Sequence, residues 1–235
     1  ARTSTTCARA SPRSLAEQAG ALTEPGRADA PARLFVDQAL ANPANRAILQ
    51  RLPALGLPDP WLVAGCLFQT VWNLRGGRPP AEGIRDHDLF YFDASDLSLE
   101  AEVAIGRRVQ AACADLGVTL EVKNQARVHT WYEAYFGAPY SPLRSSMEGI
   151  DRFLVDGTCV GLQPRPGGLT LYAPDGLGGL MHGVLRPNPR SPDARLYAAK
   201  ARDYQRRWPG LQVLDDVATQ RAGALLVHGI AAAQG

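Results

Sequence analysis

The order of short apolar segments and helical segments between residues 61 and 123 limits the possible folds more than any other feature. Three segments have the apolar, aromatic and β-branched composition of strands: Trp61–Ala64, Arg85–Phe92 and Val118–Lys123. Two helical segments, Leu67–Leu74 and Leu99–Leu116, separate them. The order strand, helix, strand, helix, strand predicts an α/β (α+β) fold in which helices flank a mixed β-sheet.

The second of these helices has recognisable ends. Ser98 precedes it and can accept a hydrogen bond from the first helical turn, and Gly117 follows it, as glycine often does at a helix C-terminus. The apolar side of the helix, which we expect to pack on the sheet, is predicted to consist of Leu99, Val103, Val109, Cys113 and Leu116.

The sequence on both sides of this centre adds further elements. More helices are predicted at Leu34–Ala41, Pro43–Leu52 and Ala126–Gly137, after Ser145, after Asp175, and from Ser191 to Trp208. Ser145 and Glu148 have the spacing of a capping box. Thr158–Gln163 and Leu169–Ala173, separated by PRPGG, predict a β-hairpin.

The first 32 residues are rich in Ala, Arg, Ser, Thr and Pro and contain few large apolar residues. We therefore expect a flexible N-terminal segment at 1–32 and one domain at 33–235, whose C-terminal part is a helical and hairpin extension. The segment lacks the apolar core of a secretory signal. An organellar transit segment is the alternative, because Ala1–Ala16 carries three arginines and no acid.

Charge and cysteine content narrow the class of protein. The formal net charge is +2, so the chain has no strong positive field for extended nucleic acid. Its apolar runs are much shorter than a membrane span. The four cysteines are far apart and form no C-x-x-C pair, which disfavours a zinc cluster and fits a reducing compartment. These features predict a cytoplasmic protein.

Asp86 and Asp88 are one residue apart in a predicted strand, within GIRDHDLFYFD. Alternate residues of a strand face the same way, so both carboxylates share one face and repel each other unless a cation compensates them. Glu121 faces the same site if its strand is the neighbour. Oxygen ligands suit Mg²⁺ or Mn²⁺, and three carboxylates can hold two such ions. The alternative is that all three are ordinary surface acids.

Gly65 and Cys66 lie between a predicted strand and a predicted helix. A glycine there lets backbone N–H groups approach a phosphate, whose negative charge the helix N-terminus favours. A strand-to-helix turn also often needs glycine for structural reasons alone. The histidines are predicted to be structural: His87 points away from the two aspartates, and His129 and His182 are isolated.

The order of these residues resembles the nucleotidyltransferase superfamily that includes the palm of DNA polymerase β. The sequence is most similar to a bacterial-type, nucleotidyltransferase-like branch of it, at WLVAGCLFQTVWN, DHDLFYFD, EVKNQARVHTWY, YAPDGLGGL and RPNP. The resemblance covers roughly Trp61 to Leu214. It implies that Asp86, Asp88 and Glu121 bind metal. It also implies a triphosphate near Gly65 and Cys66, where the superfamily has Gly-Gly or Gly-Ser.

Polar residues follow Glu121 directly. Lys123, Asn124 and Arg127 offer many hydrogen-bond donors that can neutralise phosphates or hold the acceptor. The alternative is that they are ordinary polar residues at a helix N-terminus. Arg144 and Thr158 are weaker candidates for the same role.

Together these features predict a Mg²⁺-dependent nucleotidyltransferase. An acceptor hydroxyl on a small molecule, a protein or RNA would attack the α-phosphate of a nucleoside triphosphate, and pyrophosphate would leave. Two other functions stay open: a non-catalytic nucleotide-binding or interaction module on the same fold, and a metal-dependent phosphohydrolase. The presence of all three acids favours the enzyme over the module, and the lack of well-spaced histidines near them disfavours the phosphohydrolase.

Overall fold

The structure is a computed structural model that describes residues 30–214 of the 235-residue chain. Its centre is a five-stranded sheet in the order β3-β2-β1-β4-β5, in which β2 and β3 are parallel and the other neighbours antiparallel. This mixed sheet confirms the predicted fold class. The strands are β1 (Trp61–Val63), β2 (His87–Tyr91), β3 (Leu120–Asn124), β4 (Gly161–Arg165) and β5 (Gly168–Tyr172).

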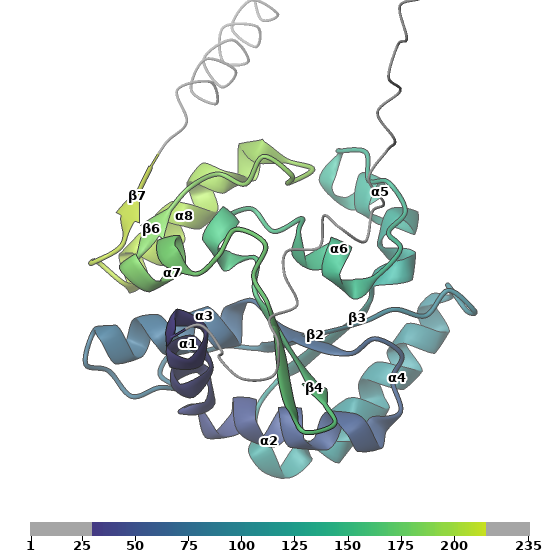
Figure 1. Cartoon of the computed structure of the whole chain (residues 1–235). Helices are drawn as coiled ribbons and strands as arrows, with labels where there is room; N and C mark the ends of the chain where they lie inside the picture. The colour runs from purple at the N-terminus through teal and green to yellow at the C-terminus, as the bar shows by residue number, and fades with distance from the viewer. Residues whose placement is uncertain (1–29, 215–235) are drawn as a thin grey trace, which may run out of the picture.

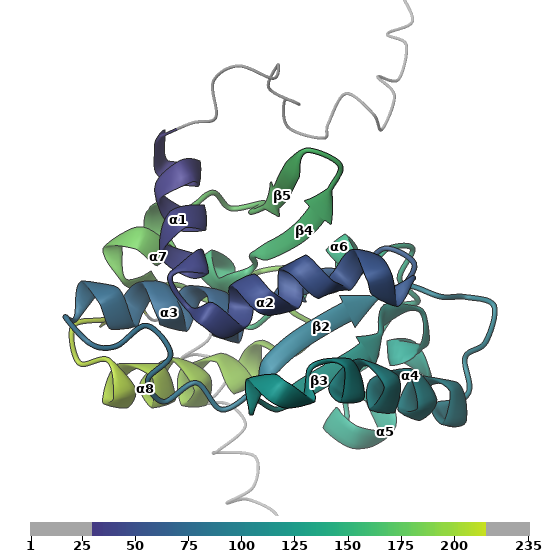
Figure 2. The same ribbon diagram turned by 90° about the horizontal axis from the view of Figure 1, so that it is seen from below.

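Helices lie on both sides of the sheet (Figure 1). Figure 2 shows α2 and α4 crossing one side of the sheet, and Figure 1 shows α6, α7 and α8 on the other. The α-helices are α1 (Ala30–Leu40), α2 (Pro43–Arg51), α3 (Gly65–Arg75), α4 (Leu99–Ala112), α5 (Tyr132–Phe136), α6 (Ser146–Ile150), α7 (Gly178–His182) and α8 (Tyr197–Arg207). The 3-10 helices are η2 (Leu52–Leu55), η3 (Ala114–Leu116), η4 (Gln125–Thr130), η5 (Asp156–Thr158) and η6 (Ala194–Leu196).

The capping signals in the sequence act where they were predicted. Ser98 accepts a hydrogen bond from the Ala101 N–H at 3.2 Å and starts α4. Ser145 accepts one from the Glu148 N–H at 3.3 Å and starts α6. The Glu148 carboxylate does not complete a capping box, because it accepts hydrogen bonds from Arg144 instead.

Successive side chains of β2 and β3 point to opposite sides of the sheet, one side being the core and the other the site. On β2, His87, Leu89 and Tyr91 are buried, whereas the residues between them are half-buried. On β3, Leu120 and Val122 are buried, and Glu121 between them faces the opposite side. Asp88 and Glu121 therefore project to the side of the sheet opposite to Leu89 and Val122.

Aromatic side chains hold α8 against α3. Tyr204 contacts Phe68 and Trp72 with ring centroids 5.4 Å apart in both pairs, and Trp208 contacts Trp72 at the same distance. The Trp208 indole N–H also donates to the Asn73 side chain at 2.8 Å. A small two-stranded sheet, β6 (Val184–Leu185) with β7 (Gln212–Val213), completes this C-terminal part. These contacts place α8 against α3.

Several predicted details are wrong. Leu99 and Val103 are 54% and 40% exposed, so the inward side of α4 is narrower than predicted. The predicted helix Ala126–Gly137 is divided into η4 and α5. Asp175 does not start a helix, because α7 begins at Gly178. These differences arise because tertiary packing overrides local helix signals.

The predicted N-terminal segment 1–32 extends too far, because α1 begins at Ala30. Residues 1–29, with Cys7, lie outside the described part of the chain. The other three cysteines, Cys66, Cys113 and Cys159, are buried and free. Within residues 30–214, no helix is both long enough and apolar enough to cross a membrane.

Candidate active site

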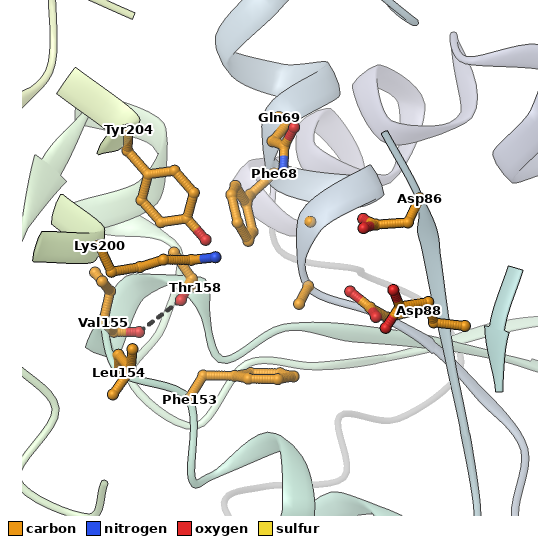
Figure 3. Close-up of a pocket in the computed structure, with 13 residues that line it drawn as sticks. Phe68, Gln69, Asp86, Asp88, Phe153, Leu154, Val155, Thr158, Lys200 and Tyr204 are labelled. Atoms are coloured by element: carbon orange, nitrogen blue, oxygen red, sulfur yellow. Dashed lines mark hydrogen bonds between the residues drawn. The ribbon is translucent and has the colours of Figure 1, made fainter. Parts of the chain in front are cut away.

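A cavity of about 320 Å³ opens between the large sheet and α8. Figure 3 shows Asp86 and Asp88 on one side of it and Lys200 and Tyr204 on the other. We call this cavity the cleft. The other lining residues come from the start of α3, from β3 and from the segment before β4, and they are Ala64, Gly65, Phe68, Gln69, Glu121, Phe153, Leu154, Val155 and Thr158.

The sheet register brings the three predicted carboxylates to this cleft. Asp88 on β2 is the direct partner of Glu121 on the parallel strand β3. Asp86 precedes β2 by one residue and lines the same cleft. Paired residues on neighbouring strands project to the same face of a sheet, which is why residues 33 positions apart in the sequence share one cavity.

The cleft raises the pKa of its central carboxyl. Burial first, and then the negative charges of Asp86 and Glu121, raise the pKa of Asp88 to about 7, whereas Lys200 and Lys123 oppose the shift. Residues 30–214 form seven ion pairs, and none of them includes any of the three acids. Without a bound cation, Asp88 therefore carries its charge at a cost in free energy.

The donor set fits a hard divalent cation. Asp86, Asp88 and Glu121 offer carboxylate oxygens only, which Mg²⁺ and Mn²⁺ prefer, and no histidine or cysteine is among the residues that line the cleft. As the side chains stand, no three His, Cys, Asp or Glu residues in the described part are close enough to hold one ion. The carboxylates must therefore move closer together to share a cation.

The first turn of α3 lies beside these acids. Ala64 precedes it at φ 49° and ψ −115°, which is a rare backbone conformation for a residue other than glycine, and no side chain caps the helix. A Cβ on Gly65 would lie 3.0 Å from Gln69 Nε2 and 3.8 Å from Asp88 Oδ2. The missing Cβ leaves room for a ligand to approach the first N–H groups of α3, which have no acceptor within the helix.

The Cys66 side chain does not take part in this cleft. It is fully buried, and its thiol donates a hydrogen bond to the Val63 carbonyl, with sulfur and oxygen 3.6 Å apart. Burial raises the pKa of the thiol well above its usual value. Only the backbone of Cys66 is therefore available to a phosphate.

Of the predicted donors after Glu121, two are engaged elsewhere. The Asn124 side chain donates to the Asp93 carbonyl and accepts from the Asp93 and Ala126 N–H groups. Arg127 forms a buried ion pair with Glu102 at 2.8 Å and also donates to the Leu97 carbonyl. Both side chains tie η4 to its neighbours and lie outside the cleft.

The third of these donors, Lys123, and the two weaker candidates, Arg144 and Thr158, differ in whether they line the cleft. Lys123 is half-buried on the same face of β3 as Glu121, but it does not line the cleft. Arg144 pairs with Glu148 on the surface. Thr158 does line the cleft, and its hydroxyl donates to the Val155 carbonyl at 2.8 Å (Figure 3).

His87 is buried on the opposite face of the sheet, as its position between the two aspartates predicted. Burial lowers its pKa to about 4, so the imidazole is neutral at physiological pH. Neither of its nitrogens has a hydrogen-bond partner. His129 and His182 do not line the cleft either.

Sequence reasoning missed the wall formed by α8. Lys200 and Tyr204 are more than 75 residues after Glu121, yet both line the cleft, and the Lys200 ammonium lies 5.1 Å from the centre of the Tyr204 ring. Their spacing of four residues places them on one face of a helix. The sequence therefore shows that the two side chains share a helix face, but only the docking of α8 on α3 shows that this face lines the cleft.

Comparisons with known proteins bear on the fold and the family of the chain. No curated protein matches the chain significantly. A solved structure described as "The NMR structure of the protein reveals a CCA-adding enzyme head domain" matches with a TM-score of 0.65 and 26% sequence identity, over 78% of this chain and 96% of that one. The sequence model of a family described as "Nucleotidyltransferase" matches residues 50–213. That match spans well over half of the chain, which therefore belongs to this nucleotidyltransferase family.

Proposed function

We propose that the protein is a divalent-metal-dependent nucleotidyltransferase that transfers a nucleoside monophosphate from a nucleoside triphosphate to an acceptor hydroxyl, with release of pyrophosphate. The observation that carries the proposal is the pairing of Asp88 with Glu121 across two parallel strands, in a cleft that Asp86 also lines. The likeness to a structure described as a CCA-adding enzyme head domain supports it.

The three acids would hold Mg²⁺ or Mn²⁺. A cation there lowers the pKa of an attacking hydroxyl and neutralises charge on the phosphates. A bound cation would stabilise the charged form of the acids, because Asp88 is buried among like charges and none of the three acids forms an ion pair with residues 30–214. The same environment would orient an acceptor hydroxyl toward the α-phosphate through hydrogen bonds to carboxylate oxygens.

The phosphates would be held from two directions. The uncapped first turn of α3, with the backbone N–H groups of Gly65 and Cys66, offers donors on the side of the acids. Lys200 offers a positive charge from α8, and no carboxylate among the described residues pairs with it. A triphosphate lying between α3 and α8 would satisfy both sets of groups.

Two other functions follow from the same fold. A non-catalytic nucleotide-binding module needs the phosphate-binding groups but not three acids on adjacent strands. A phosphohydrolase with a dinuclear site would be expected to use histidine ligands, and the cleft lining contains no histidine. The acceptor is expected to be a small molecule, a protein or a short RNA end, because the net charge of +2 provides little attraction for long nucleic acid.

The direct test is label transfer. The full chain is incubated with Mg²⁺, a cell extract and each of the four α-³²P-labelled ribonucleoside triphosphates, and transfer of label to any acceptor is measured. We expect transfer from the native protein, its loss with EDTA, and a decrease of about 10²-fold or more in Asp88→Asn. Asp37→Asn is the matched control, because Asp37 is exposed on α1 and does not line the cleft.

Each outcome separates the three functions. Equal transfer by the native protein and Asp88→Asn would refute the proposal. Triphosphate binding without any transfer would support the binding module. Release of phosphate or pyrophosphate with no labelled acceptor would support a phosphohydrolase.

A further inference from the structure

A second cavity, of about 260 Å³, lies outside the cleft and shares no lining residue with it. Three arginines line it: Arg75, Arg78 and Arg207. Its apolar lining residues are Trp72, Trp208, Pro209 and Leu211. No acidic residue is part of this lining. We call this cavity the arginine pocket.

The arginine pocket lies further along the contact between α3 and α8 than the cleft does. On α3 the cleft is lined by Gln69, and the pocket begins one turn later at Trp72. On α8 the cleft is lined by Tyr204, and the pocket begins at Arg207. A hydrogen bond of 2.9 Å from Arg207 to the Gln69 side-chain oxygen lies between the two cavities.

The pocket has more positive charge than its surroundings neutralise. Glu82 pairs with Arg78 at 2.7 Å. Arg75 and Arg207 form no ion pair with any described residue. Burial and the nearby Arg85 and Arg78 lower the pKa of Arg207, whereas Asp203 opposes this shift. Arg75 and Arg207 therefore keep positive charges that no ion pair in the described part of the chain neutralises.

Two of the arginines are held in place before any ligand binds. The Arg207 guanidinium lies 4.3 Å from the centre of the Trp208 ring, and the Arg78 guanidinium lies 5.7 Å from it. Arg207 also donates to the Gly83 carbonyl at 2.7 Å, and Arg78 donates to the Arg207 carbonyl at 3.0 Å. A ligand would not lose much side-chain entropy by binding to groups that are already ordered.

We propose that the arginine pocket binds a phosphate monoester attached to a small apolar or aromatic body. A phosphate monoester carries close to two negative charges at neutral pH, which matches the two uncompensated arginines, and its oxygens fit the guanidinium fork. A carboxylate carries only one. The apolar body would contact Trp72 and Leu211. A cavity of this size holds a ligand smaller than a nucleoside triphosphate.

Phenyl phosphate is the simplest probe of this class, and the full chain provides a built-in reporter. The four tryptophans give four indole N–H signals in a ¹⁵N–¹H spectrum. On titration with phenyl phosphate we expect saturable shifts of the Trp72 and Trp208 signals and none of the Trp61 and Trp131 signals. Inorganic phosphate, which lacks the apolar body, and benzoate, which lacks the second charge, should both bind more weakly.

Single substitutions test whether phenyl phosphate binds in the arginine pocket. Arg75→Gln removes an exposed arginine that forms no ion pair with residues 30–214, so the fold should be unaffected, and we expect about tenfold weaker binding of phenyl phosphate. Arg207→Gln should weaken it further. Arg202→Gln on α8 removes the same charge outside the pocket, and Lys200→Met alters the cleft only; both should leave the affinity unchanged.

Three results would contradict the proposal. Unsaturable or absent shifts at Trp72 and Trp208 would overturn the proposal, and so would benzoate binding as tightly as phenyl phosphate. An affinity that falls in Lys200→Met but not in Arg75→Gln would assign the ligand to the cleft. The test needs no activity, so it stands whether or not nucleotidyl transfer is found.

Discussion

Asp88 on β2 lies directly opposite Glu121 on the parallel strand β3, and Val63 of β1 is its partner on the other side. The central acid is therefore flanked by an apolar strand and by a second acid. This position explains both its burial and the rise of its pKa to about 7. A carboxylate in such a place destabilises the metal-free fold, and a bound cation would remove that penalty.

The first prediction concerns the pH dependence of stability without metal. The folded pKa of Asp88, about 7, lies above the ordinary value of 3.8, so the folded state keeps a proton that the unfolded state has lost. Stability contributed by this group is therefore complete below pH 4 and is lost as the pH rises toward 7. At pH 8, Asp88→Asn should unfold at a higher urea concentration than the native protein, because its free energy of unfolding is higher by up to about 4 kcal/mol; at pH 4 the two should differ little.

Urea unfolding in the presence of EDTA measures this difference at several pH values. The exposed Asp37→Asn should show the same pH dependence as the native protein. If Asp88→Asn is instead less stable than the native protein at pH 8, the carboxylate has a structural partner and the proposed metal site loses its basis.

The second prediction concerns Lys200 in the cleft. If its ammonium pairs with the β- or γ-phosphate, Lys200→Met should weaken nucleoside triphosphate binding about tenfold and leave nucleoside monophosphate binding unchanged. Lys200→Arg should restore most of the affinity. Calorimetric titration with both nucleotides decides this, with Arg202→Met, an exposed residue of α8, as the control. An equal loss for both nucleotides would place Lys200 near the base or the α-phosphate.

The third prediction concerns Gly65 at the start of α3. The Cβ in Gly65→Ala would lie 3.0 Å from the flexible end of Gln69 and 3.8 Å from Asp88 Oδ2. Gln69 can move, so we expect the melting temperature to change by no more than a few degrees. The methyl group would obstruct the approach of a phosphate to the first turn of the helix, so KM for the triphosphate should rise about tenfold. A normal KM would show that the phosphates bind elsewhere.

The fourth prediction separates a structural from a ligand-binding role for Arg127. Its ion pair with Glu102 is buried, with side chains 9% and 8% exposed. Arg127→Met should destabilise the fold by about 3 kcal/mol, because a buried carboxylate would lose its partner. Below its melting temperature the variant should bind triphosphate normally. Glu102→Gln combined with Arg127→Met should recover part of the stability, and a specific loss of binding in Arg127→Met would restore it as a phosphate-binding candidate.

The sequence predicted the elements of the sheet well, because their signals are local. The apolar segments Trp61–Ala64 and Arg85–Phe92 contain β1 and β2, and Val118–Lys123 contains all of β3 except its last residue, Asn124. Ser98 starts α4, and Gly117, at φ 64°, ends the helical segment after it. A capping hydroxyl and a glycine with positive φ act on residues within one turn, so their effect can be read from neighbouring letters.

The sequence was a less reliable guide to which hydrogen-bond partner a polar side chain has in the folded protein. Asn124 and Arg127 are donor-rich and follow Glu121, which made them candidates for phosphate binding. In the fold, Glu102 on α4 accepts hydrogen bonds from both the Arg127 side chain and the Asn124 N–H. Which acceptor a buried donor finds depends on helix docking, and no local pattern encodes that choice.

The sequence by itself determined that Asp86 and Asp88 face the same way, because a strand repeats every two residues. Only the tertiary structure decided that β3 is the parallel neighbour of β2, which puts Glu121 opposite Asp88, and that α8 closes the cleft with Lys200. The physical reason is one of range: backbone periodicity acts over a few residues, whereas strand pairing and helix docking depend on burying apolar surface from distant segments, such as Trp72 and Trp208, together.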